Sequence, residues 1–327
     1  MIGVGHLGRQ HARIHAALSA EGRAQLVSVC DLEEETARAV SAERETAWTT
    51  DWRTLLGQVD AVSLSVPTES HCEIGCQLLA AGIHVLVEKP IARSLEEADR
   101  MIEAAASSGA LLQVGHLERF NPALVALRPH VHEPLYFEIH RVGQFTARSL
   151  DIDVVLDLMI HDLDIVQWLV GEDVEVTDVR AVGIPVLTNR VDAANARVEF
   201  ANGAVANITA SRVGTEKIRK MRFFQPHDYV AVDYTTRHAS ISSLAPPAGA
   251  SPHPGVHVHH PQIKDVEPLR AEIEAFLEAA STGAPSPVSG REGRRALALA
   301  LRALEKMREH VEQAGLPLSI VHSESQI

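Results

Sequence analysis

The first third of the chain alternates short apolar runs with longer segments of helical periodicity. The apolar runs, rich in β-branched residues, occupy residues 25–30, 60–66, 83–87 and 111–114. The amphipathic segments occupy residues 9–18, 33–41, 69–81 and 94–106. Short runs that are apolar throughout are typical of strands buried on both faces. The pattern therefore predicts an α/β fold, with a doubly wound parallel sheet and right-handed crossovers.

After about residue 119 the apolar residues alternate with polar ones. Strand-like segments occupy residues 133–143, 174–186, 193–200, 204–211 and 221–232, with another near Ser240. Asn202-Gly203 is a strong hairpin signal. We therefore predict an open, mostly antiparallel sheet. Residues 245–261, rich in Pro, Gly and His, are predicted to form a loop, and residues 267–280 and 290–312 are predicted helices.

Composition narrows the possible functions. A chain of 327 residues with 46% hydrophobic residues can form two domains with full cores. The formal net charge of −13 argues against a nucleic-acid partner. Three cysteines are too few for a disulfide framework. Because neither a membrane-spanning stretch nor a signal peptide is apparent, we expect a soluble cytoplasmic protein.

The N-terminal segment Gly-Val-Gly-His-Leu-Gly, residues 3–8, matches the G-x-G-x-x-G pattern of dinucleotide sites. Its glycines permit a tight turn, a close pyrophosphate and a closely packed helix. Asp31 follows the next predicted strand at roughly the spacing of about 20 residues that is typical of a ribose-binding acid. Its carboxylate suits a ribose 2′-hydroxyl and repels a 2′-phosphate, which favours NAD over NADP. Asp31 can also cap the helix near Glu33, and the two roles are compatible.

Lys89 follows the strand 83–87, within Glu88-Lys89-Pro90. Parallel sheets bind ligands at the carboxyl ends of their strands. An ammonium group there can stabilise an alkoxide as hydride leaves the adjacent carbon. The alternative is a solvated loop lysine.

Asp157 and His161 lie four residues apart, on one face of a predicted helix. An imidazole beside a carboxylate suits the role of general base for a sugar hydroxyl. The alternative is a helix N-terminus with acidic residues on the dipole and a packed His161. The lysine and the glycine motif together favour the catalytic interpretation.

The order of GVGHLG, VEKP and DLMIHDLD resembles the glucose–fructose oxidoreductase, inositol dehydrogenase and MocA (Gfo/Idh/MocA) family over nearly the whole chain. The resemblance extends to VPTESHCEIG and PVSGREGRRAL. It implies oxidation of a sugar or cyclitol hydroxyl with NAD(P), and a catalytic set of Lys89, Asp157 and His161. The candidate cofactor contacts are Gly3, Gly5, His6, Leu7, Gly8, Asp31, Pro67, Thr68, His71, Glu88 and Lys89.

We accordingly expect residues 1–118 to form an NAD-binding Rossmann domain. Residues 119–327 are expected to form an α+β domain for substrate binding and oligomerisation, with its last helices packed back on the first domain. A homodimer or a homotetramer is compatible with an exposed sheet face. Only Met1 and Ile2 precede the glycine motif, so we expect unpaired backbone groups on the neighbouring strands and a natural start upstream.

The segments VGHLERFNP, RVG and LDLMIHD resemble more narrowly the subgroup that oxidises the 3-hydroxyl of UDP-N-acetylglucosamine, before an aminotransferase acts. A nucleotide-sugar needs cations for its diphosphate, although each candidate cation also fits a surface or structural role. The candidate cations are Arg119, Arg141, Arg148, Lys217, Arg219 and Lys220. The full set of candidate substrate contacts is Lys89, Glu118, Arg119, Asn121, Arg141, Arg148 and His161.

Other functions remain open. The substrate can instead be an inositol, a free sugar or a UDP-sugar acid, and a non-catalytic NAD-binding regulator is an alternative from another class. Intact Lys89, Asp157 and His161 weigh against a regulator, which needs no proton relay. The histidines at 253, 257, 259 and 260 match no standard zinc spacing, so no metal is expected.

Overall fold

The computed structural model describes residues 1–144, 152–245 and 255–315, and the chain divides into two compact units. The first unit consists of Met1–Leu117 and Glu267–Leu297. The second consists of Glu118–Val266 and Ala298–Ile327.

The first unit contains the predicted parallel sheet. Its strands pair as β1–β2 and as β3–β4–β5, all in parallel. The strands are β1 (Ser28–Cys30), β2 (Ala47–Thr49), β3 (Ala61–Leu64), β4 (His84–Glu88) and β5 (Leu112–Gly115). The helices are α1 (His6–Ala20), α2 (Glu34–Arg44), α3 (His71–Ala80), α4 (Leu95–Ser108), α7 (Pro268–Thr282) and the first part of α8 (Gly290–Ala314).

Met1 and Ile2 lie between β1 and β3. Ile2 forms parallel bridges to Cys30 and to Leu64. Its amide donates to the carbonyl of Ser63 at 2.9 Å, and the amide of Cys30 donates to the carbonyl of Met1 at 2.8 Å. Met1 and Ile2 thus pair with both neighbouring strands at these positions.

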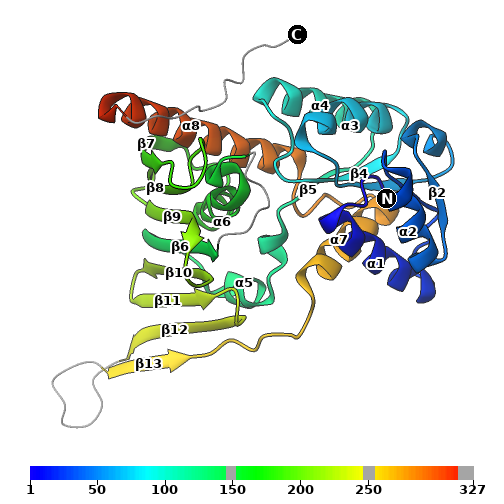
Figure 1. Cartoon of the computed structure of the whole chain (residues 1–327). Helices are drawn as coiled ribbons and strands as arrows, with labels where there is room; N and C mark the ends of the chain where they lie inside the picture. The colour runs from blue at the N-terminus through cyan, green and yellow to red at the C-terminus, as the bar shows by residue number, and fades with distance from the viewer. Residues whose placement is uncertain (145–151, 246–254, 316–327) are drawn as a thin grey trace. The chain divides into compact units, whose positions relative to one another are not determined.

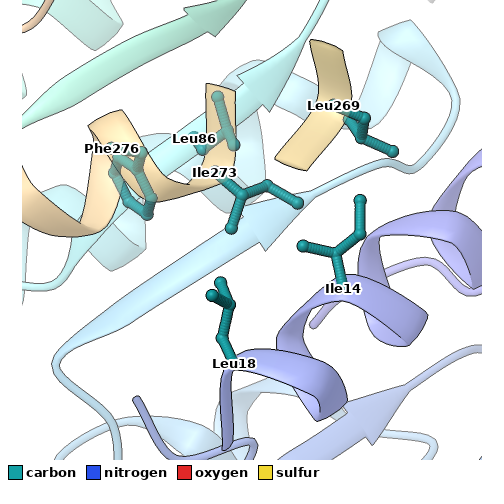
Figure 2. Packing of buried hydrophobic residues seen from close by; sticks show 6 residues of the cluster. All are labelled: Ile14, Leu18, Leu86, Leu269, Ile273 and Phe276. Carbon is teal, nitrogen blue, oxygen red and sulfur yellow. The ribbon is translucent and has the colours of Figure 1, made fainter. Parts of the chain in front are cut away.

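Six buried apolar residues pack α1 and α7 against β4 (Figure 2). They are Ile14, Leu18, Leu86, Leu269, Ile273 and Phe276. The α7 members are spaced by four and three residues, so they form one apolar stripe of the helix. Pro268 at the first turn and Gly283, with φ of +71°, delimit α7. Burying one such side chain stabilises the fold by about 1.5–3 kcal/mol.

The second unit contains an eight-stranded sheet in the order β13-β12-β11-β10-β6-β9-β8-β7 (Figure 1). All neighbours are antiparallel except β6 and β9. The strands are β6 (Tyr136–Gln144), β7 (Val176–Ile184), β8 (Ala193–Phe200), β9 (Val205–Gly214), β10 (Ile218–Gln225), β11 (Asp228–Asp233), β12 (His238–Ala245) and β13 (Gly255–His259). Helices α5 (Pro122–Leu127) and α6 (Ile160–Val170) also belong to this unit. The prediction of an open, mostly antiparallel sheet is confirmed.

Two turn predictions have different outcomes. The Asn202-Gly203 hairpin is confirmed, because Gly203 has φ of +88° and joins the antiparallel strands β8 and β9. The predicted loop at 245–261 is wrong for Gly255–His259, which pair with β12 as β13. Val256 and Val258 alternate with His257 and His259, a strand periodicity that the Pro-rich and Gly-rich context obscured.

The helices that close the chain were predicted at 267–280 and 290–312, and they form α7 and α8. Among the residues that the structure describes, no helix combines the length and the apolar character that crossing a membrane requires.

Candidate active site

The glycine motif forms a close-packed turn with one open side. A Cβ added to Gly8 would lie 1.9 Å from the carbonyl oxygen of Gly3, and one added to Gly3, at φ of +79°, would lie 2.5 Å from that of Ser65. A Cβ added to Gly5 would meet nothing within 4 Å. Gly5, the N-cap residue, gives α1 no side-chain cap, and the N-terminus of a helix favours an anion. The loop therefore fits a dinucleotide pyrophosphate.

Asp31 is bonded to the glycine loop. One carboxylate oxygen accepts a hydrogen bond from the Val4 amide at 2.8 Å, and the other accepts one from the Glu33 amide at 3.1 Å. The second bond lies in the turn before α2, but the N-cap residue of that helix is Glu33, so the alternative of Asp31 as the N-cap is wrong. The first fixes the loop relative to the end of β1, where a ribose hydroxyl would bind.

Lys89 follows a buried carboxylate. Glu88 ends β4, and one of its oxygens lies 2.9 Å from Nε2 of the buried His11. The other oxygen accepts a 3.3 Å hydrogen bond from the Lys89 amide. Burial acts to raise the pKa of Glu88, but the hydrogen bond to His11 and nearby positive charge outweigh it and lower the pKa. Glu88 thus holds the Lys89 backbone, and the Lys89 side chain is half-buried.

His71 bridges two loops at the carboxyl ends of β3 and β4. Its ring nitrogens lie 3.0 Å from the carbonyl oxygens of Val66 and Pro90. Burial lowers the pKa of His71, so the neutral ring donates to one of the two carbonyls. These contacts give His71 a supporting role in the loops. Pro67 and Thr68, the other candidates here, lie at the start of the turn before α3, and Pro67 is exposed.

Asp157 and His161 lie on a continuous helical segment that starts as a π-turn. The turn spans Val155–Met159 and continues into α6 at Ile160. Both candidate side chains are half-buried. The sequence predicted a helix but gave no sign of the π-turn, a local widening that is frequent at functional sites.

Arg141 is held inside the second unit. It is 2% exposed, and its guanidinium forms two 2.7 Å bonds to the Asp162 carboxylate and a third to Glu118. Burial opposes its charge, but Asp162 and Glu118 outweigh burial and raise the pKa of Arg141 well above its usual value. Arg141 therefore connects β6 to α6, beside His161.

Three other candidate substrate contacts, Glu118, Arg119 and Asn121, are also bonded internally. Arg119, 6% exposed, forms two 2.8 Å bonds to Asp164 and stacks with Trp168. Asn121 caps α5 and donates to Glu118 at 3.2 Å. This geometry matches the structural alternative that the sequence left open, because no exposed charge remains on these side chains to meet a diphosphate. Arg148 lies outside the described residues.

The second unit has a pair of more accessible cations. Lys217 is exposed and Arg219 is partly exposed. The charge of Arg219 lowers the pKa of Lys217, while burial and the charge of Arg141 lower that of Arg219. The negative charge of Asp157 acts in the opposite direction and raises the pKa of Arg219. Arg219 is therefore close enough to interact electrostatically with the helical segment that carries Asp157. Closely spaced cations of this kind favour an anionic ligand.

The sequence interpretation missed a buried polar cluster in the first unit. It consists of His11, Glu88 and Glu272, and one imidazole nitrogen and one oxygen of each carboxyl group lie within 4.8 Å of one another. A signal was present, because Glu272 interrupts the apolar stripe of α7 at a core-facing position, three residues after Leu269 and four before Phe276.

One cavity lies away from these groups. It has a volume of about 720 Å³ and is lined by α7 and by residues at the amino ends of β3 and β4. Parallel sheets bind cofactors at the opposite, carboxyl ends of their strands, so this cavity is not at the end of the sheet where a dinucleotide would bind.

Known proteins show similarity along most of the chain. The profile of the GFO_IDH_MocA family, an oxidoreductase family with an NAD-binding Rossmann fold, matches residues 1–116. The profile of the GFO/IDH/MocA C-terminal domain matches residues 125–224. A UDP-N-acetylglucosamine 3-dehydrogenase of Acidithiobacillus ferrooxidans is 42% identical over 304 residues, which cover 92% of this chain and 94% of that protein.

A solved structure of a UDP-N-acetylglucosamine 3-dehydrogenase from that organism matches with a TM-score of 0.86 at 40% identity, covering 94% of this chain and 96% of the other. Levoglucosan dehydrogenase in complex with NADH has a TM-score of 0.83 at 19% identity, with coverages of 94% and 96%, and shows the same fold. An inositol 2-dehydrogenase of Rhizobium meliloti is 27% identical, covering 94% of this chain and 96% of that protein. The chain belongs to the GFO/IDH/MocA family of oxidoreductases, as a dehydrogenase of CH–OH groups with an NAD-binding Rossmann fold in residues 1–116.

Proposed function

We propose that the protein oxidises the 3-hydroxyl of UDP-N-acetylglucosamine with NAD. The observation that carries this proposal is the 42% identity, over 92% of the chain, to a dehydrogenase of that name. The cation pair Lys217 and Arg219 supports a substrate that carries phosphate.

In the proposed mechanism His161 accepts the hydroxyl proton as the carbonyl forms. Asp157 orients the imidazole and stabilises its protonated form. Lys89 stabilises the negative charge that develops on the oxygen. NAD, when bound in the glycine loop, supplies the hydride acceptor. The oxidation thus sends one hydride to the cofactor and one proton to His161, and leaves a 3-oxo sugar.

We infer that the first unit binds the cofactor and that the second contributes Asp157, His161 and the cation pair. Arg141, Glu118, Arg119 and Asn121 are proposed to hold the second unit's elements in place rather than to contact substrate directly, because their polar groups are bonded internally.

The similarity to an inositol dehydrogenase favours a second candidate substrate, a cyclitol. A cyclitol carries no diphosphate, so it gives no role to Lys217 and Arg219. The two candidates therefore differ in whether these cations affect the Michaelis constant.

The 3-oxo product is a ketone, the substrate class of aminotransferases, and we propose such an enzyme as the next in the reaction sequence. We also propose that the protein self-associates as a homodimer or homotetramer through the outer face of the eight-stranded sheet. Large apolar side chains on this face are exposed, among them Val182, Ile184 and Phe224.

Replacing Lys89 or His161 with Ala should lower kcat by at least about 10²-fold, because each removes a group that acts on the reacting hydroxyl. The dissociation constant for NAD should change by less than about twofold, because a tenfold change would require a loss of about 1.4 kcal/mol in binding free energy. Stopped-flow turnover and NAD titration measure the two effects. Lys264→Ala and His257→Ala, both at exposed positions, are the matched controls. Full turnover in either test variant would exclude the assigned role.

Asp31→Asn should shift cofactor preference toward NADP. The amide keeps an acceptor for the Val4 amide but removes the charge that repels a 2′-phosphate. We expect the NADP/NAD ratio of kcat/KM to rise by about tenfold, equivalent to 1.4 kcal/mol. Glu33→Gln alters a neighbouring exposed charge and should leave the ratio unchanged. An unaltered ratio in Asp31→Asn argues against the ribose contact.

Lys217→Ala and Arg219→Ala should each raise KM for UDP-N-acetylglucosamine by about 10-fold or more, since a charge-assisted hydrogen bond contributes about 1.5–3 kcal/mol. KM for NAD should not change. Lys220→Ala is the control, because Lys220 follows Arg219 in β10 and so lies on the opposite face of the sheet. Unchanged sugar KM in both test variants would count against a diphosphate contact.

Phe224→Asp should shift the protein toward monomers, because it places a charge on the exposed sheet face. Sedimentation equilibrium measures the molecular mass. Val125→Asp is a control at an exposed apolar position on α5. A wild-type protein that is monomeric at tens of micromolar would contradict the oligomer proposal.

A further inference from the structure

The buried cluster of His11, Glu88 and Glu272 joins three elements of the first unit. His11 lies on α1, Glu88 ends β4, and Glu272 lies on α7. Their exposed fractions are 1%, 9% and 0%. The cluster therefore consists of three buried ionisable side chains, and one of them, Glu88, directly precedes Lys89 in the chain.

The three side chains are bonded unequally. Glu88 binds His11 through one oxygen and the Lys89 amide through the other. Both carboxyl oxygens of Glu272 have no hydrogen-bond partner among the described residues, and both are fully buried. Nδ1 of His11 is likewise unpartnered.

Two carboxylates this close cannot both be ionised in an apolar interior, because each would destabilise the other's charge. Glu88 has compensating partners and Glu272 has none, so the charge belongs on Glu88. Burial and the charge of Glu88 accordingly raise the pKa of Glu272 well above its usual value.

We propose that Glu272 is an uncharged carboxylic acid in the native protein and acts as a positioning residue for Lys89. A neutral Glu272 lets the Glu88 carboxylate remain on His11 and on the Lys89 amide. An ionised Glu272 would repel the Glu88 carboxylate and compete for His11. The positioning role rests on the proposed catalytic function of Lys89, whereas the protonation state of Glu272 does not.

The neighbouring titratable groups are consistent with this assignment. His15, on α1, has its pKa lowered to about 3, first by burial, so it supplies no positive charge. Lys89 on the β4 side and His71 on α3 act on Glu88 rather than on Glu272. Gln113 on β5 donates to the backbone carbonyl of Glu272, which leaves the carboxyl group unaltered.

Infrared difference spectroscopy of the full-length protein tests the protonation directly. Wild type minus Glu272→Gln at pH 7 should show the carbonyl stretching band of one protonated carboxylic acid. Glu278→Gln, at an exposed position on the same helix, should show only the loss of a carboxylate. The absence of the carboxylic-acid band would overturn the proposal, and so would one equivalent of a divalent metal in the purified protein.

The pH dependence of stability gives an independent test. Glu272 has a raised pKa in the folded state, so its contribution is fully present below the unfolded value near 4.5 and is lost as pH rises toward the folded value. Between the unfolded pKa near 4.5 and the raised folded pKa, the unfolding constant of wild type should increase about tenfold per pH unit relative to that of Glu272→Gln. Parallel curves for the two proteins would contradict a neutral Glu272.

Turnover separates positioning from packing. Glu272→Gln should retain kcat near pH 7 and should lose the alkaline decline that ionisation of Glu272 causes in wild type. Glu272→Leu also removes the ionisable group and keeps the helix apolar, so it should fold at least as stably as wild type, retain kcat near pH 7 and likewise lack the alkaline decline. An alkaline decline in kcat that persists unchanged in both variants would refute the positioning role. If Lys89→Ala is itself fully active, the lysine assignment fails, and the infrared result still decides the protonation of Glu272.

Discussion

A buried ionised group without a partner destabilises a protein by several kcal/mol. In each unit of this chain, a buried carboxylate next to a candidate catalytic residue has such partners. In the first unit the buried carboxylate of Glu88 precedes Lys89 and is bonded to His11 and to the Lys89 amide. In the second unit the carboxylate of Asp162 follows His161 and is bonded twice to the buried Arg141. Each candidate catalytic side chain thus extends from a backbone segment next to a buried carboxylate that is already paired.

The same arrangement separates supporting charges from charges available to ligands. Arg141 and Arg119 are enclosed by carboxylates and hold α6 within its unit. Lys217 is exposed, and its pKa is lowered chiefly by Arg219. A protein with a net charge of −13 can therefore present a local positive site. This contrast supports a phosphate-bearing substrate better than the overall composition does.

Much of the fold could be predicted from the sequence because local patterns determine it. The parallel strands are apolar on both faces, and Asn202-Gly203 specifies its hairpin. The roles of Arg141 and Arg119 could not be predicted, because their partners lie 21 to 45 residues away along the chain. β13 was missed because its run of alternating residues was short and the residues around it resembled a loop. Glu272 was detectable as an acid on an apolar stripe, but its relation to Glu88 needed the folded chain.

For the site, Lys89, Asp157 and His161 were identified from motif and resemblance, and their joint role remains a proposal. The most direct measurement is NADH absorbance on mixing the protein with NAD and UDP-N-acetylglucosamine, with an aminotransferase and its amino donor present to remove the ketone. We predict NADH formation with the nucleotide-sugar and none with free N-acetylglucosamine. NAD binding without NADH formation from UDP-N-acetylglucosamine, together with oxidation of an inositol, would contradict the account.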